Sequence, residues 1–172
     1  MATQKDVEMY ATAARGYVSR ALGLELDGSE TSLAFVDHYI QKSGGAALKD
    51  DLLALVAPAL GAYFGEVVIA KLGGAWALDG EDPARWRVEL EPVELRFYPV
   101  GMAAAALRGG EVDGYDDSFG TRPELMARLS EALAMSPVVE ADYFYSLTGR
   151  LETLTHVTEL LVEIERRLRG RD

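Results

Sequence analysis

Apolar residues recur at spacings of three and four over three stretches in the first half of the chain, as they do along one face of an α-helix. The first stretch runs from Val7 to Leu22, the second from Leu33 to Ile40, and the third from Ala46 to Leu72. Glycines, which commonly stop helices, follow closely after each stretch. The pattern therefore predicts three helices before residue 74.

The third of these helices is the most apolar part of the chain. From Leu52 to Gly65 it is apolar on nearly every face, until Glu66 interrupts the run. This run is shorter than the roughly 18 residues that indicate a membrane span, so we expect a buried central helix. Pro58 removes a backbone donor inside it, which predicts a kink between Ala54 and Pro58 or two abutting helices.

The pattern changes to alternation after Gly74. Three runs alternate or carry β-branched and aromatic residues: Ala75–Leu78, Trp86–Leu90 and Val93–Tyr98. Asp79–Pro83 is a strong turn signal between the first two runs, and Pro92 should end pairing between the second and the third. We expect three short antiparallel strands here.

The remainder of the chain returns mainly to helical spacing. Val100–Gly110 predicts a short helix closed by glycines, and Glu111–Gly120 predicts a loop. Thr121–Glu124 opens a further helix, and Val138–Leu147 is ambiguous between a helical turn and a strand. Leu151–Leu168 carries an apolar stripe typical of an amphipathic helix.

Together these elements predict an α+β fold in one domain over residues 1–172. A small antiparallel sheet of three or four strands should be covered by the long central helix, the N-terminal helices and the C-terminal helix. Ala57, Gly61 and Gly65 lie on one side of the central helix, so another element can approach closely there.

Composition narrows the function classes. The chain has 172 residues, 49% of them apolar, which is enough to form a core and excludes intrinsic disorder. With 17 Lys and Arg against 28 Asp and Glu, its net charge of −11 argues against nucleic acid and anionic membranes and leaves a basic or neutral protein partner open.

Two absences in the sequence bear on its compartment and chemistry. The chain has no cysteine, which excludes disulfides, thiolate metal sites and cysteine nucleophiles and fits a reducing compartment. The first twenty residues lack the apolar centre of a signal peptide, so we expect a cytoplasmic protein.

The loop Glu111–Gly120 crowds four carboxylates around two aromatic residues. Its spacing does not match a calcium-binding loop, so a solvated acidic turn is the favoured interpretation. Tyr115 and Phe119 either anchor this loop to the core, which we favour, or form a contact patch for a basic partner. The candidate partner surface comprises Asp113, Tyr115, Asp116, Asp117 and Phe119.

Catalytic motifs are sparse. His38 follows Asp37, and His156 lies four residues after Glu152, so each histidine has a nearby acid. The sequence has no GxSxG, HExxH or glycine-rich phosphate motif, and we predict no catalytic, cofactor-binding or metal-ligating residues. The enzyme alternative is a small hydrolase or ligand-binding enzyme that uses Glu66 with His38, or with the carboxylates of the acidic loop.

Two segments resemble a loose group of bacterial proteins with no assigned chemistry. One is LELDGSETSLAFVDHYI, from Leu24 to Ile40, and the other is LGAYFGEVVIAKLGGAW, from Leu60 to Trp76. The matching residues are Leu26, Asp27, Ser32, Leu33, Val36, Asp37, Gly61, Tyr63, Gly65, Glu66, Gly73, Gly74 and Trp76. This resemblance implies a domain of unknown function with the fold expected above, and it implies no catalytic residues.

The sequence thus favours a non-enzymatic acidic module that binds a protein, in the manner of toxin-neutralising immunity proteins. Its oligomeric state is left open by these patterns.

Overall fold

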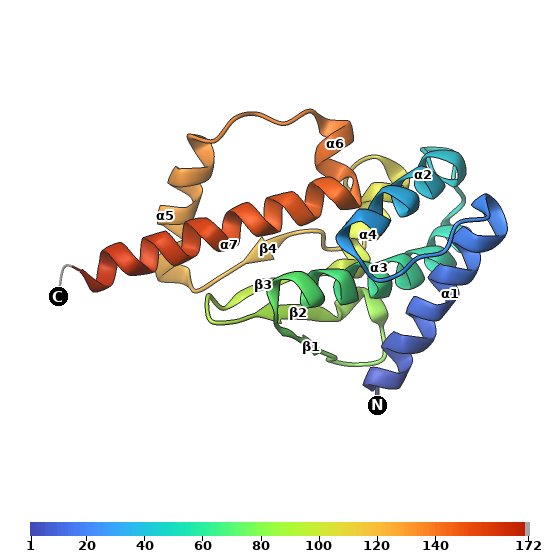
Figure 1. Ribbon diagram of the computed structural model, residues 1–172, viewed down its shortest axis with the longest axis horizontal. Helices are drawn as coiled ribbons and strands as arrows, with labels where there is room; N and C mark the ends of the chain where they lie inside the picture. The colour runs from blue at the N-terminus through green and yellow to red at the C-terminus, as the bar shows by residue number, and fades with distance from the viewer. Residues whose placement is uncertain (171–172) are drawn as a thin grey trace.

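A computed structural model describes residues 1–170 of the chain. Within these residues seven α-helices pack with a single four-stranded antiparallel sheet (Figure 1). This arrangement confirms the predicted α+β class and its small sheet. The central and C-terminal helices cross the molecule, and the sheet lies along one side of them.

The first helix and the short turn before the second helix both begin at polar caps. In α1 (Gln4–Leu22) the Asp6 carboxylate accepts a hydrogen bond of 2.7 Å from the backbone N–H of Thr3, completing a capping box. A single 3-10 turn, η1 (Glu30–Ser32), leads into α2 (Leu33–Ser43). The Ser29 side chain caps this turn by accepting a hydrogen bond from the backbone N–H of Ser32.

The central helix α3 (Asp50–Leu72) begins four residues later than the sequence predicted. Residues 45–48 form a turn instead, in which the N–H of Leu48 donates to the carbonyl of Gly45 at 3.1 Å. The N–H of Gly45 in turn donates to the carbonyl of Leu107 at 2.6 Å and holds the chain against another helix. Asp50 and Asp51 then occupy the first turn of α3, where carboxylates interact favourably with the helix dipole.

Pro58 lies inside α3, and the helix is continuous through it. The alternative of two abutting helices is therefore wrong. An 18-residue window of α3 has a mean hydropathy of 2.0, long and apolar enough to cross a membrane, but 67% of that window is buried within the fold. Such burial is typical of the core helix of a globular domain.

The sheet runs in the order β1 (Ala75–Ala77), β2 (Arg87–Leu90), β3 (Leu95–Phe97) and β4 (Phe119–Gly120). The first three strands fall within the predicted runs but are shorter. The fourth corrects the prediction of a loop over residues 111–120, since the last two of those residues pair with β3. A two-residue strand is too short to show alternation in the sequence.

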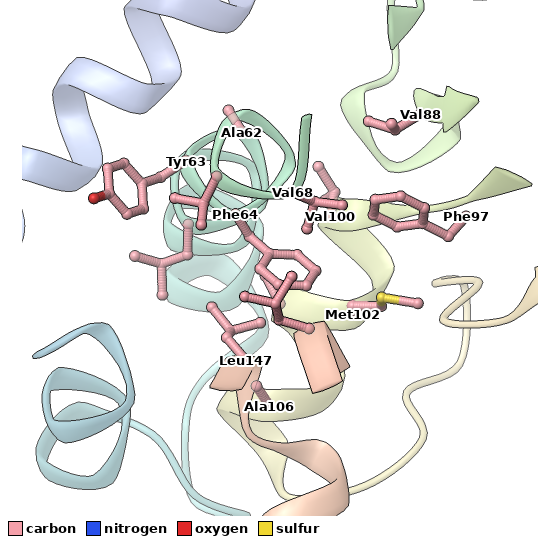
Figure 2. Packing of buried hydrophobic residues seen from close by; sticks show 14 of the residues in the cluster. Ala62, Tyr63, Phe64, Val68, Val88, Phe97, Val100, Met102, Ala106 and Leu147 are labelled. Atoms are coloured by element: carbon pink, nitrogen blue, oxygen red, sulfur yellow. The ribbon is translucent and has the colours of Figure 1, made fainter. Parts of the chain in front are cut away.

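The core is centred between α3 and α4 (Pro99–Arg108), as Figure 2 shows. A Cβ atom on Gly61 would come within 2.5 Å of Val100 Cα, and one on Gly65 would overlap the Trp76 ring. The small residues of α3 therefore permit close contact with a helix and with the first strand. This confirms the packing role predicted for them.

Three helices complete the fold: α5 (Pro123–Ala134), α6 (Ala141–Tyr145) and α7 (Leu147–Arg169). The ambiguous segment 138–147 therefore contains a short helix and no strand. The predicted stripe of α7 faces the core, where its buried leucine and valine residues are Leu147, Leu151, Leu154, Val157 and Leu161. The helix begins four residues before the first residue of that predicted stripe.

Candidate functional site

The acidic loop is held to the body of the protein by Arg150. This arginine lies in the first turns of α7 and is only 3% exposed. Its Nη2 bonds the Asp117 carboxylate at 2.5 Å, and its Nη1 donates to the Asp117 carbonyl at 3.2 Å. The guanidinium also lies over the rings of Phe144 and Tyr145. Asp117 is therefore engaged in an internal ion pair.

Sequence reasoning missed Arg150, although a signal was present. It follows Leu147 by three residues and precedes Leu154 by four, so it shares the buried face of α7. A charged residue on such a face needs a partner, because an isolated buried charge is strongly unfavourable. That requirement indicates a structural ion pair without naming the partner.

The other predicted loop residues separate into different roles. Asp116 accepts hydrogen bonds from the backbone N–H and hydroxyl of Ser118, at 2.9 and 2.5 Å, which closes a local turn. Tyr115 and Phe119 are half-buried and pack against the core, so the anchoring interpretation is confirmed. Burial, followed by the charge of Asp82, raises the pKa of the Tyr115 phenol.

Asp113 and Tyr115 line a pocket of about 680 Å³, which we call the acidic pocket. Its full lining is Ala46, Asp50, Leu53, Arg108, Glu111, Val112, Asp113 and Tyr115. Arg108 contributes the one cation of this lining, and its Nη2 bonds the Asp50 carboxylate at 2.5 Å. The pocket therefore retains the carboxylates of Glu111 and Asp113 in excess over positive charge.

Glu66 lies elsewhere, at a junction of three elements. Its Oε1 accepts hydrogen bonds from Gln4 Nε2 at 3.0 Å and from Trp76 Nε1 at 2.9 Å. It therefore links α3 to α1 and to β1. The motif residues Glu66 and Trp76 have a structural explanation in this contact.

The two histidines are exposed and do not lie in the acidic pocket. His38 lies on α2, beside a separate hollow, and His156 Nε2 contacts the Ser136 hydroxyl at 3.1 Å. A hydrolase would require His38, Glu66 and the loop carboxylates to share one pocket. The pocket that holds Asp113 contains neither His38 nor Glu66 in its lining.

Asp37, the acidic neighbour of His38, caps the last helix. Its carboxylate accepts hydrogen bonds from the backbone N–H groups of Leu147 and Thr148, at 2.8 and 3.1 Å, and from the Thr148 hydroxyl at 2.6 Å. These contacts satisfy donors that a helix N-terminus otherwise leaves without partners. They also tie α2 to α7.

Replacing this cap tests its role. We expect Asp37→Ala to lower the free energy of unfolding by about 1 to 2 kcal/mol, the usual cost of losing a helix cap. Urea denaturation monitored by circular dichroism measures the change. Glu159→Ala, at an exposed position in the middle of α7, is the control, and an equal loss in both variants would contradict the capping role.

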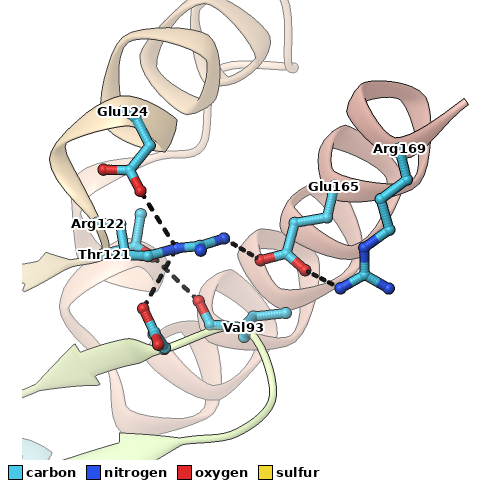
Figure 3. A network of polar contacts seen from close by, with 7 residues as sticks. Val93, Thr121, Arg122, Glu124, Glu165 and Arg169 are labelled. Carbon is cyan, nitrogen blue, oxygen red and sulfur yellow. Dashed lines mark hydrogen bonds and ion pairs between the residues drawn. The ribbon is translucent and has the colours of Figure 1, made fainter. Parts of the chain in front are cut away.

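A second charged cluster joins the β2–β3 turn to the last helices (Figure 3). Arg122 forms ion pairs with Glu94 at 3.2 Å and with Glu165 at 2.6 Å. The Thr121 hydroxyl donates to the Val93 carbonyl at 3.0 Å. Each of these contacts joins segments far apart in the chain, and their role is structural.

The part of the chain that the structure describes does not suggest a metal site, and the chain has no match among known proteins. Over residues 1–170 no group of three or more His, Asp or Glu side chains is placed to hold a metal ion. Comparison with protein-family models, curated proteins and solved structures finds no match to this chain. The fold and the site therefore define the protein as an α+β domain with an acidic surface pocket.

Proposed function

We propose that the protein is a non-enzymatic acidic module whose acidic pocket binds a basic side chain of a protein partner. The observation that carries this proposal is the pocket lining, which has three carboxylates, one arginine already bonded to Asp50, and a half-buried tyrosine. A lysine or arginine entering the pocket would meet the excess negative charge of Glu111 and Asp113.

Tyr115 gives the pocket an apolar wall as well as its charge. Its ring packs against the core, and burial raises the pKa of its phenol, so the side chain is neutral at physiological pH. The aliphatic stem of a lysine or arginine can lie along such a wall while its charged head meets carboxylates. The lining therefore suits a long cationic side chain better than a compact metal ion.

The test uses acetylated, amidated tetralysine and isothermal titration calorimetry at low ionic strength. We expect the wild-type protein to bind this peptide, and added salt to weaken the binding. The double variant Glu111→Gln, Asp113→Asn preserves side-chain shape and should weaken binding by about tenfold or more, since two attractive charges are lost.

The matched control removes two exposed carboxylates that do not line the acidic pocket, Glu131→Gln with Glu159→Gln. It changes net charge by the same amount, so it should bind nearly as well as the wild type. Absence of tetralysine binding, or an equal loss in the control, would contradict the proposal.

A further inference from the structure

We infer that the acidic pocket is one end of a longer trough, and that its occupant is an extended basic segment of a partner protein. The inference rests on the proposed function and extends it. A second hollow of about 290 Å³ shares Arg108 with the acidic pocket. A third, of about 530 Å³, shares Asp37, Gln41, Asp142 and Ser146 with the second. Each hollow therefore adjoins the next at the residues that they share.

Carboxylates line each of the three hollows. The carboxylates that line them are Asp37, Asp50, Glu111, Asp113, Glu140 and Asp142. Arg108 is the only lysine or arginine among the residues that line the three hollows, and its side chain is paired with Asp50. The Asp37 carboxylate already caps α7. The other carboxylates lie toward the two ends, with Glu111 and Asp113 in the first hollow and Glu140 and Asp142 in the third.

The middle of the trough favours cations for a second, independent reason. Helices α2 and α4 both end there, because Gly44 and Gly109, the residues that follow them, line the second hollow. Helix C-termini carry partial negative charge and carbonyls without helical partners. The N-terminus of α7 also borders the trough at Ser146, but the Asp37 carboxylate offsets its partial positive charge.

The walls are apolar between these charges, which distinguishes a polypeptide from a bare polycation. The half-buried residues Val112, Tyr115 and Tyr145 supply this apolar surface, with the buried side chains of Ile40, Leu53 and Leu107 behind it. An extended segment places successive side chains on opposite sides. Lysine or arginine residues can then reach the acidic ends while the intervening apolar residues contact these walls.

The experiment measures affinity as a function of peptide length and of charge at the far end of the trough. Dilysine, tetralysine and octalysine, each acetylated and amidated, are titrated into the wild-type protein and into the variant Glu140→Gln, Asp142→Asn. We expect the wild type to bind octalysine at least about tenfold more tightly than dilysine. The far-end variant should lose about tenfold for octalysine and retain its affinity for dilysine.

The Glu131→Gln, Glu159→Gln control separates trough binding from general attraction to an acidic protein. A lysine peptide in which apolar residues alternate with lysine should bind more tightly than octalysine, and spermine should bind less tightly than either. Equal octalysine losses in the far-end variant and the control, or equal binding of spermine and peptide, would overturn the inference and leave the acidic pocket intact. Failure of every peptide to bind would overturn the proposed function itself.

Discussion

Arg150→Ala is expected to lower the free energy of unfolding by about 3 kcal/mol. Breaking a buried ion pair by removing one partner costs about 3 to 5 kcal/mol, because the other charge is left without compensation. Asp117 is 21% exposed, so water would partly solvate its carboxylate, and the expected loss is at the lower end, about 3 kcal/mol. Urea denaturation at neutral pH measures the change in the free energy of unfolding.

A second variant separates lost charge from lost packing. Arg150→Met keeps an unbranched stem against Phe144 but removes the donors to Asp117, and combining it with Asp117→Asn completes a double-mutant cycle. We expect a coupling energy above about 1 kcal/mol, as found for contacting charged residues. Arg166→Ala on the exposed end of α7 is the control and should cost less than about 1 kcal/mol. Equal losses for Arg150 and Arg166 would contradict the anchoring role.

Arg150 also marks the limit of sequence-based prediction for this chain. Periodicity predicted the helices, since burial of α1, α2 and α7 follows spacings of three and four along a continuous segment. The partner of Arg150 lies 33 residues away in an irregular loop. No local pattern encodes that distance, because the pair forms only when α7 and the loop are both placed by the core.

The errors at element ends have the same physical origin. The residues that follow Gly45 have helical composition, but the hydrogen bond from Gly45 to Leu107 holds the chain in a turn there. Phe119 and Gly120 become a strand because β3 offers a free edge beside them. In both cases a contact with a distant element outweighs local preference.

The candidate site was predicted only in part for this reason. Asp113 and Tyr115 do line the acidic pocket, whereas Asp117 turns inward to Arg150. Asp50 and Arg108 complete the pocket from α3 and α4, and the sequence alone did not connect them with the loop. Charge along the chain indicates where acids are dense, but the fold decides which of them face a common space.

Gly101→Ala is the second substitution with a large expected effect, and it acts on the same loop. A Cβ atom at this position would overlap the carbonyl group of Asp116 and lie 3.1 Å from the backbone nitrogen of Asp117. Backbone cannot move aside as a flexible side chain can, so the loop must shift away from α4. Overpacking of this kind costs about 1 to 3 kcal/mol and occasionally more.

Two further effects decide the net result. Alanine favours a helix over glycine by about 1 kcal/mol, which opposes the steric cost. The shift, however, also displaces Asp117, so part of the Arg150 ion pair should be lost with it. We therefore expect a net destabilisation of about 2 to 3 kcal/mol, combining the overpacking cost with this loss. The measurement is again urea denaturation.

Gly110→Ala is the matched control for this effect, since a Cβ atom there meets nothing within 4 Å. It should change stability by less than about 0.5 kcal/mol, as surface substitutions usually do.

If Gly101 and Arg150 act through one loop, combining Gly101→Ala with Arg150→Ala should cost less than the sum of the two single variants. Full additivity would show that the two contacts are independent, and a neutral Gly101→Ala would show that α4 and the loop are not in close contact. Gly101→Ala should also weaken tetralysine binding, because the loop that it displaces holds Glu111 and Asp113 in the lining of the acidic pocket.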